Sequence, residues 1–114
     1  MALVKVVAGE LQDGFIRVKN IQDAPTQSVS MPNRFVAVID SGIEVEVEPG
    51  YCLCFSIVPE LSEQGVSITN APGRVKNGKV VLHVLNGGRN IVNLSHGDVV
   101  AKCWVEQDHE VSWR

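Results

Sequence analysis

Apolar residues recur along the chain in short stretches, and residues typical of turns separate these stretches. Val occurs 20 times and Ile 7 times against 6 Ala, and β-branched side chains favour strands over helices. Nine stretches have the length of a strand, at residues 3–7, 15–18, 35–39, 43–47, 52–58, 66–68, 80–85, 91–94 and 99–105. Short strands at such close intervals predict an all-β sandwich or barrel.

The segments between the stretches carry turn chemistry. They are residues 40–42, 48–50, 71–73, 77–78, 86–88 and 96–98. Gly87 and Gly88 are expected to form a hairpin between two strands. Only residues 59–65 favour a helical turn, because Pro59 is well placed to open one. Residues 22–32 are expected to form the longest polar loop.

Length and charge narrow the class of protein. A chain of 114 residues suits one domain, residues 1–114, and 45% hydrophobic against 20% charged residues indicates a packed globular protein. The net charge is -3 and basic residues are scattered, so no nucleic-acid partner is expected. The chain begins without a signal pattern and has no apolar run of membrane-spanning length, so we expect neither export by that route nor a membrane partner.

The cysteines do not have the pattern of a metal or disulfide framework. Cys52 and Cys54 alternate on one face of an expected strand, without the two-residue gap of zinc knuckles. Together with Cys103 they are odd in number and are expected to be reduced, buried thiols.

Other potentially reactive residues favour structural roles. Residues 43–48 alternate apolar and acidic, which favours a solvated strand face that discourages edge pairing over a metal or acid–base site. His83, His96 and His109 lack any pairing motif and are expected to be structural or solvent-facing. The sequence predicts no metal site and no cofactor.

A resemblance begins at Ser41. Residues 41–51, the pair Val58-Pro59, and residues 65–73, 78–86 and 97–102 resemble, in the same order, motifs of the trimeric dUTP pyrophosphatase family. The resemblance implies a dUTPase-like fold, described as a distorted β-barrel or jelly-roll-like sandwich. It also implies a homotrimer and makes residues 65–73 the entrance to the base-binding hairpin.

The residues that the resemblance requires for catalysis differ. Glu60 and Leu61 stand where the family holds phosphates, Lys76 stands in place of a water-orienting Asp, and Lys102 replaces a Gln. An ammonium group has no lone pair to accept a proton from water. Asn70 is retained as a base-edge candidate, although its place in a good turn is the better explanation. We therefore expect no catalytic residues and no enzyme activity.

A small acidic β trimer without enzyme activity favours a structural role. The leading hypothesis is a capsid decoration or cement protein of a tailed bacteriophage. Its partner would be the major capsid protein, and it would lie on the virion surface after synthesis in the host cytoplasm. The alternatives are a divergent dUTP pyrophosphatase that rebuilds its site with Lys76, Lys102 and Glu60, or a nucleotide-sensing regulatory protein.

Contacts with other chains are expected at the C-terminal end of the sequence. Trp104, Val111 and Trp113 are the candidate oligomer contacts, because indole rings bury large areas at interfaces. Residues 105–114 resemble a tail that crosses to a neighbouring protomer, so deleting residues 108–114 is expected to weaken the trimer. Residues 2–7 and 22–32 are the candidates for reaching a further partner.

Overall fold

The computed structural model describes residues 3–69 and 74–107, which form an almost entirely β structure. Its elements are β1 (Val4–Ala8), β2 (Phe15–Arg17), β3 (Asn20–Ile21), β4 (Ser28–Met31), β5 (Val36–Val47), β6 (Tyr51–Ile57), α1 (Pro59–Ser62), β7 (Val66–Ile68), β8 (Arg74–Val75), β9 (Asn77–Asn86), β10 (Val92–Ser95) and β11 (Val99–Gln107). All pairings between these strands are antiparallel.

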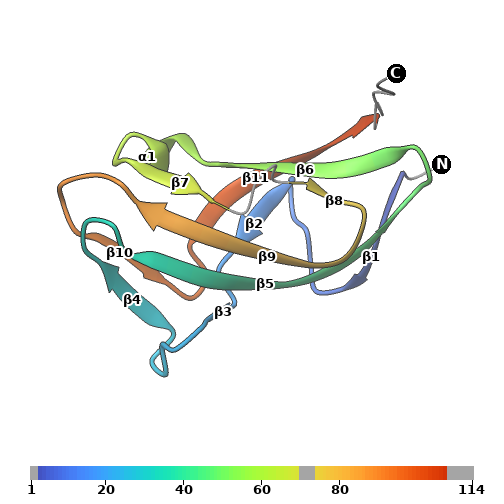
Figure 1. Cartoon of the computed structure of the whole chain (residues 1–114). Coiled ribbons are helices and arrows are strands. Elements are labelled where there is room, and N and C mark those ends of the chain that lie inside the picture. The colour runs from blue at the N-terminus through green and yellow to red at the C-terminus, as the bar shows by residue number, and fades with distance from the viewer. Residues whose placement is uncertain (1–2, 70–73, 108–114) are drawn as a thin grey trace, which may run out of the picture.

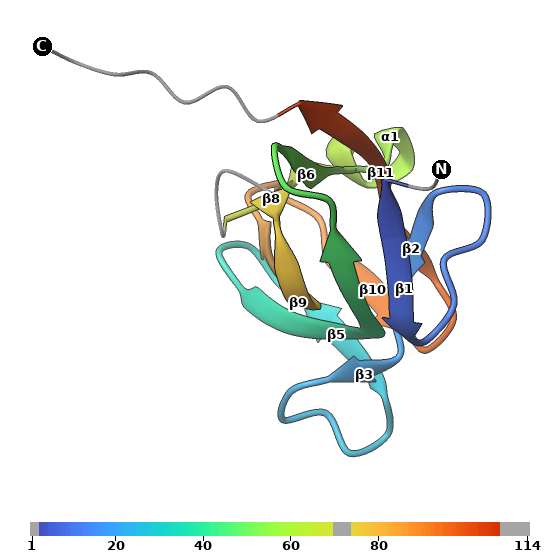
Figure 2. The same ribbon diagram turned by 90° about the vertical axis from the view of Figure 1, so that its right-hand side faces the viewer.

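The strands form three sheets. Sheet A has the order β1-β5-β9-β7, with β3 also pairing β5, and sheet B has the order β2-β11-β6-β8. Sheet C is the pair β10-β4. Figure 1 shows β6 and β11 of sheet B above β5 and β9 of sheet A, and Figure 2 shows β1, β5 and β9 side by side. The expected sandwich of antiparallel strands is confirmed.

Strict alternation in sequence gives each large strand one buried face. In β5 every second residue from Ala37 to Val47 is buried, and in β9 the buried positions run from Val80 to Asn86. The register places Ile39 opposite Leu82, so the buried faces of the two strands coincide. In sheet B, Leu53 and Phe55 of β6 face the same interior.

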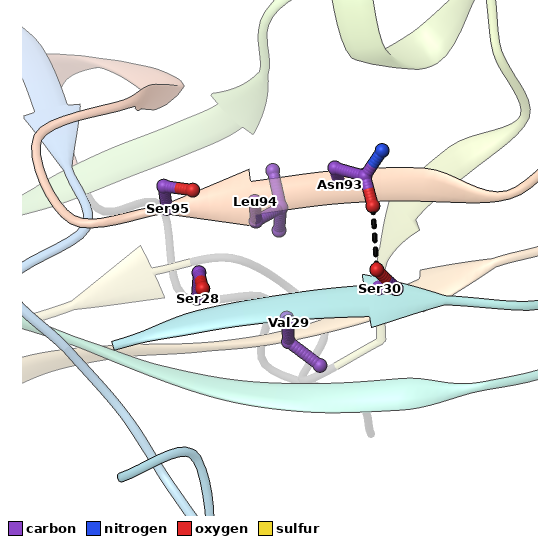
Figure 3. Close-up of a pocket in the computed structure, with 6 residues that line it drawn as sticks. All are labelled: Ser28, Val29, Ser30, Asn93, Leu94 and Ser95. Atoms are coloured by element: carbon purple, nitrogen blue, oxygen red, sulfur yellow. Dashed lines mark hydrogen bonds between the residues drawn. The ribbon is translucent and has the colours of Figure 1, made fainter. Parts of the chain in front are cut away.

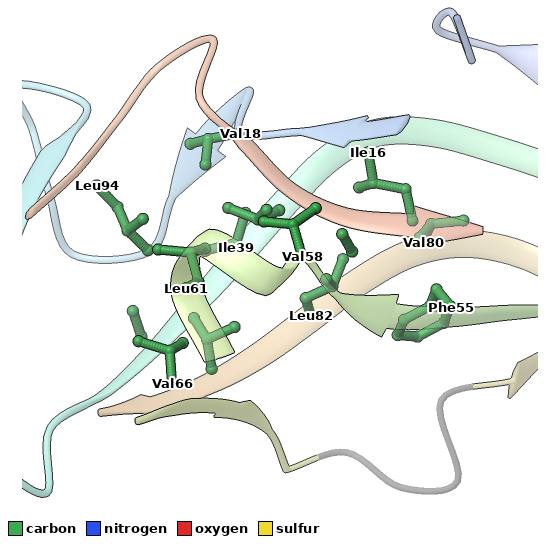
Figure 4. Packing of buried hydrophobic residues seen from close by; sticks show 14 of the residues in the cluster. Ile16, Val18, Ile39, Phe55, Val58, Leu61, Val66, Val80, Leu82 and Leu94 are labelled. Carbon is green, nitrogen blue, oxygen red and sulfur yellow. The ribbon is translucent and has the colours of Figure 1, made fainter. Parts of the chain in front are cut away.

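The core lies between sheets A and B and extends towards sheet C. Figure 4 shows side chains from both large sheets, α1 and β10 packing in one cluster. Leu61 is the buried residue of α1, and it joins this cluster together with Val58, which precedes the helix. The short helix is therefore held in place by its apolar side chain. The expectation of a helical turn in residues 59–65 is confirmed.

The expected turn at residues 40–42 is wrong. Strand β5 continues through this segment, and its register against β9 shifts between Asp40 and Glu44. Gly42 has φ +70, and the Asp40 side chain accepts a 2.8 Å hydrogen bond from the Gly42 backbone N–H. The Asp-Ser-Gly chemistry of a turn has thus formed a bulge within one strand.

Three other local expectations are also wrong. Residues 22–32 are not all loop, because they contain β4. Asn77 and Gly78 begin β9 rather than forming a turn. Gly87 and Gly88 connect β9 to β10, which pair with different strands, so they form a crossing between sheets and not a hairpin.

The expected N-terminal strand is present, but the acidic strand does not lie at a sheet edge. Strand β1 is hydrogen-bonded to β5 at one edge of sheet A, and its role in reaching a partner stays a prediction. Strand β5 is flanked by β1 and β9 and is therefore not an edge that needs protection. Its carboxylates face cations across the sheet, because Glu46 lies opposite Lys5 and Glu44 opposite Lys79.

Candidate functional site

The segment from β7 to β8 crosses from sheet A to sheet B. At its start, Thr69 donates a 2.8 Å hydrogen bond from its backbone N–H to the His83 carbonyl of β9. At its end, β8 pairs with β6, with Arg74 opposite Cys54. The described ends therefore belong to two different sheets and do not pair as a simple hairpin. Asn70 lies outside the described residues, so its role as a base-edge candidate stays a prediction.

Arg74 and Lys76 place positive charge beside this crossing. Both residues are exposed. The Lys76 backbone carbonyl accepts a 3.1 Å hydrogen bond from the Val47 N–H, which fixes the chain at the junction of β8 and β9. The end of the crossing thus presents two cationic side chains on an anchored backbone, which suits an anionic ligand.

One protomer does not bring Lys76, Lys102 and Glu60 into one row. Val75, next to Lys76, lies opposite Leu53 of β6, whereas Lys102 lies opposite Ser56. Three residues along a strand separate positions by about 10 Å. The nitrogen of the Lys102 side chain lies 6.0 Å from the centre of the Phe15 ring, on the side of β11 away from β6 and β8.

The residues after Pro59 are divided between core and surface. Leu61 is buried, while Glu60 and Ser62 are exposed. The Ser62 hydroxyl donates a 3.1 Å hydrogen bond to the Pro59 carbonyl, within the same helical turn. Of the residues that the resemblance places at the phosphates, Leu61 has a packing role and Glu60 offers the only charge.

The outer face of sheet B carries a cluster that sequence reasoning missed. Its residues are Cys52 and Cys54 of β6, Arg74 of β8, and Trp104 and Glu106 of β11. The Trp104 Nε1–H donates a 2.8 Å hydrogen bond to Glu106 Oε1, and Arg74 Nη2 lies 3.9 Å from Glu106 Oε2. Trp104 is 41% exposed. In sequence, this face is marked by alternate residues of one stretch, Lys102, Trp104 and Glu106. Only the register of β11 against β6 shows that Trp104 and Glu106 lie over the two cysteines.

The two thiols of this cluster are close together. The Cys52 and Cys54 Sγ atoms lie 3.7 Å apart, which confirms that both side chains occupy one face of the strand. The Cys54 Sγ is 3.6 Å from Glu106 Oε2. Burial, followed by the hydrogen bond and negative charge of Cys52 and then Glu106, raises the pKa of Cys54 to about 12. Cys54 is therefore a neutral thiol at neutral pH.

The surface pocket between β4 and β10 does not fit a charged ligand. It has a volume of about 280 Å³. Figure 3 shows its lining of Ser28, Val29, Ser30, Asn93, Leu94 and Ser95. The Ser30 hydroxyl donates a 2.7 Å hydrogen bond to Asn93 Oδ1 across the strand pair. No cation lines this pocket, so it offers a phosphate only hydroxyl and amide groups and no charge to pair with.

The described residues offer neither a metal-binding cluster nor a membrane-spanning helix. Residues 3–69 and 74–107 contain no group of three His, Cys, Asp or Glu side chains arranged to hold a metal ion. Within the same residues, no helix is long and apolar enough to span a membrane. Among the candidate oligomer contacts, Trp104 is exposed, whereas Val111 and Trp113 lie outside the described residues.

Two packed antiparallel sheets, closed at one end by a small third sheet, are the architecture of the dUTPases, and the chain has this dUTPase-like fold. The native dUTPase of EIAV superposes with a TM-score of 0.73 at 17% identity, covering 100% of this chain and 94% of that one. A mutant dUTPase of Staphylococcus bacteriophage 80alpha, solved with dUpNHpp, gives 0.72 at 11% identity, covering 100% and 96%. A mutant dUTPase of phage phi11 of S. aureus gives 0.68 at 12% identity, covering 99% and 95%.

The sequence is also similar to a curated enzyme. It is 28% identical over 92 residues to the deoxyuridine 5'-triphosphate nucleotidohydrolase of Desulfotalea psychrophila. The match covers 78% of this chain but only 57% of that enzyme. No protein-family model matches the chain.

These comparisons overturn the functional expectation. A capsid decoration protein without enzyme activity is contradicted, because the curated relative is a nucleotidohydrolase and the structures that share the fold are dUTPases. The expectation that the chain is not an enzyme rested on single positions such as Lys76 and Lys102, whereas the similarity to the curated enzyme extends over 92 residues. The major capsid protein as partner has no support from these relatives. The virion location depended on that role and is not tested.

Proposed function

We propose that this chain is a divergent deoxyuridine triphosphate nucleotidohydrolase. The observation that carries the proposal is the 92-residue similarity to the Desulfotalea psychrophila enzyme, in a chain with the same fold as several dUTPases. The chain spans 57% of that relative's length. The activity of the full-length relative is therefore carried over to this chain only as a proposal.

The reaction would transfer the deoxyuridylyl group, which contains the α-phosphorus, to water. Water attacks the α-phosphorus, the bond from that phosphorus to the bridging oxygen breaks, and the products are dUMP and pyrophosphate. The substrate is the magnesium complex of the nucleotide, so the metal arrives with the phosphates. The protein then has to position the nucleotide, stabilise charge on the leaving pyrophosphate and orient the water.

The chain's own residues supply these roles in an altered form. Lys76, exposed beside the crossing, offers charge to the phosphates, and Lys102 offers a further cation. Glu60, exposed on α1, is the carboxylate that would orient water. These assignments extend the rebuilt site that the sequence suggests, and each is a position to be tested.

We further propose that the active form is a homotrimer. Strand register separates Lys76 from Lys102 within one protomer, so residues from neighbouring copies would be needed to complete a compact site. Exposed apolar side chains that such an assembly would cover include Val6, Val7, Phe35, Val36 and Ile91.

The test is pyrophosphate release from dUTP and magnesium by the native oligomer, compared with the other deoxynucleoside triphosphates. We expect turnover selective for dUTP, and loss of about tenfold or more in kcat on Lys76→Ala, because a cation that stabilises phosphate charge is removed. The matched control is Lys5→Ala on β1, opposite Glu46, which should leave turnover unchanged.

Two results would reject the hydrolase. One is the absence of turnover above buffer with a folded native oligomer. The other is saturable nucleotide binding without product, which would instead indicate the nucleotide-sensing alternative. Equal loss of activity in Lys76→Ala and Lys5→Ala would remove Lys76 from the proposed site.

A further inference from the structure

Cys52 and Cys54 are buried but do not belong to the hydrophobic core. Their exposed fractions are 1% and 4%, yet the core cluster includes Cys103 and neither of these two thiols. The alternation of β6 explains this, because Leu53 and Phe55 point to the core and the cysteines point the other way. The pair is covered from outside, by side chains of β8 and β11.

The covering side chains are themselves exposed. Trp104 lies opposite Cys54 in the strand register, and Glu106 lies opposite Cys52. Arg74 lies opposite Cys54 on the other side of β6, and the side chains of Arg74 and Glu106 are each 47% exposed. Rotation of exposed side chains takes place in picoseconds to nanoseconds. A small ion could therefore reach the sulfurs without any opening of the sheet.

The spacing of the sulfurs fits a bridging ion. A tetrahedral ion with metal–sulfur bonds of about 2.3 Å holds two thiolates about 3.8 Å apart. The Cys52 and Cys54 Sγ atoms are 3.7 Å apart without any ion. A single ion could therefore bridge them with little movement of the backbone or side chains.

The same geometry resists a disulfide between the two cysteines. Alternate residues of an extended strand have Cα atoms about 6.6 Å apart, at the long end of the range that disulfides tolerate. The sulfur atoms would have to approach from 3.7 Å to about 2.0 Å, which would bend a strand hydrogen-bonded to both β8 and β11. A bridging ligand needs no such distortion.

The electrical surroundings favour a cation. Glu106 Oε2 lies 3.6 Å from the Cys54 Sγ, and the Glu106 backbone carbonyl lies 3.7 Å from the Cys52 Sγ. Both oxygens now accept hydrogen bonds from the thiols, so each sulfur has a negative or partly negative oxygen beside it. Arg74, the neighbouring cation, is 3.9 Å from Glu106 Oε2.

We propose that Cys52 and Cys54 form a two-thiol site for one soft, thiophilic metal ion on the outer face of sheet B. When the ion binds, each thiol loses its proton to solvent and the two sulfurs coordinate as thiolates. Soft thiolate ligands select ions such as Cu(I) and those of the zinc group. The pair supplies two protein ligands rather than the three or four of a zinc site, in keeping with the lack of a three-residue cluster among the described residues. Water or a small solute occupies the remaining positions.

The test is titration of the reduced full-length chain with Cd²⁺, with the thiol-to-metal charge-transfer absorption measured in the ultraviolet. We expect saturation at one ion per chain. In the Trp113→Phe background the same titration should quench the fluorescence of Trp104, because that indole lies opposite Cys54. This second readout uses the intact thiol pair and does not depend on a cysteine variant folding.

Cysteine variants locate the ion. Cys52→Ser and Cys54→Ser should each weaken binding by about a hundredfold or more, because the second thiol binds at high effective concentration. The matched control is Cys103→Ala, whose thiol belongs to the core and should not affect binding. Circular dichroism establishes that each variant is folded.

Three results would overturn the site. The first is the absence of a saturable charge-transfer band in the wild-type chain. The second is a band that survives in both serine variants and disappears in Cys103→Ala. The third is a disulfide between Cys52 and Cys54 that forms under mild oxidation, seen as a decrease in mass by two hydrogens, in a protein whose reduced form binds no Cd²⁺.

Discussion

Asn86 connects three parts of the fold through one side chain that is fully buried. Its Nδ2 donates hydrogen bonds of 2.7 Å to the Met31 carbonyl and 2.8 Å to the Asn90 carbonyl. Its Oδ1 accepts a 2.9 Å hydrogen bond from the Gly88 backbone N–H. The residue thereby ties the end of β9 to β4 and to the crossing that follows. Buried polar side chains are stable only when their partners are present.

Asn86→Ala is expected to lower the free energy of unfolding by about 2 to 4 kcal/mol, because it leaves buried backbone groups without partners. The matched control is Asn93→Ala on β10, where an exposed amide makes one hydrogen bond with Ser30. Its cost should be about 0.5 kcal/mol. Urea unfolding measures both. Equal costs for the two variants would contradict the role assigned to Asn86.

Cys54 is expected to make the metal-free protein less stable in alkali. Its pKa is raised from 9.0 to about 12, chiefly by burial and then by Cys52 and Glu106. Between these values the unfolded thiol loses its proton while the native thiol keeps it. The free energy of unfolding therefore falls as pH rises from about 9 to about 12.

Urea unfolding at about pH 8 and about pH 10, in the presence of a chelator, measures this dependence. Cys54→Ala should show a shallower loss of stability than the wild type. Ser56→Ala, two residues along the same face of β6 and exposed, is the control and should retain the wild-type slope. An unchanged slope in Cys54→Ala would show that other groups cause the alkaline loss.

At the scale of elements, the end of β1 crosses closely over the bulge of β5. Gly9 follows β1 with φ +77, and a Cβ at this position would collide with the Gly42 carbonyl oxygen. The same Cβ would lie 3.1 Å from the Ile43 Cα. The close approach of two backbones, and not only the dihedral angle, therefore requires glycine here.

Gly9→Ala is expected to cost about 2 kcal/mol or more, from the left-handed conformation together with the backbone collision. Gly50→Ala is the matched control, because Gly50 has φ +86 but no atom within 4 Å of the added Cβ. Its cost should be about 1 kcal/mol. Hydrogen exchange should show faster opening of the β1–β5 pairing in Gly9→Ala alone. Similar exchange in both variants would contradict the collision.

The strands that sequence predicts well are those with a clear apolar pattern. Strands β5 and β9 alternate between buried and less buried residues, β6 is a continuous apolar run that is buried on both faces, and all of these, like β11, overlap expected stretches. Strand β4 was missed because Ser28 and Ser30 make its sequence look like a loop. The bulge at Gly42 was taken for a turn, because local Asp-Ser-Gly chemistry is the same in both and only pairing with β9 distinguishes them.

The candidate site could likewise be predicted from the sequence only in part. The shared face of Cys52 and Cys54 followed from strand geometry, since alternate residues always point the same way. The side chains that cover the thiols depend on the register of β6 against β8 and β11. Glu106, for example, contacts Cys54 although the two residues are 52 positions apart in sequence. Long-range register is set by the whole core and cannot be read from either strand alone.

At the scale of the whole molecule, the proposed hydrolase and the proposed homotrimer make one joint prediction. Val75, the neighbour of Lys76, and Lys102 lie opposite positions of β6 that are three residues apart, so a single protomer spreads its cations along sheet B. If neighbouring copies complete the site, specific activity towards dUTP should fall when the protein is diluted below the concentration at which the trimer dissociates. The fall should be reversible, because each protomer retains its own buried core.

Light scattering and pyrophosphate release, measured over the same dilution series, test this prediction. The midpoint of the loss in specific activity should coincide with the midpoint of dissociation, because both report the same equilibrium. Trp104→Ala removes an exposed indole from sheet B and should move both midpoints to higher concentration if that side chain is an oligomer contact. Ser56→Ala on the same face is the control and should move neither. A stable monomer whose specific activity is independent of concentration would contradict the trimer while leaving the hydrolase intact.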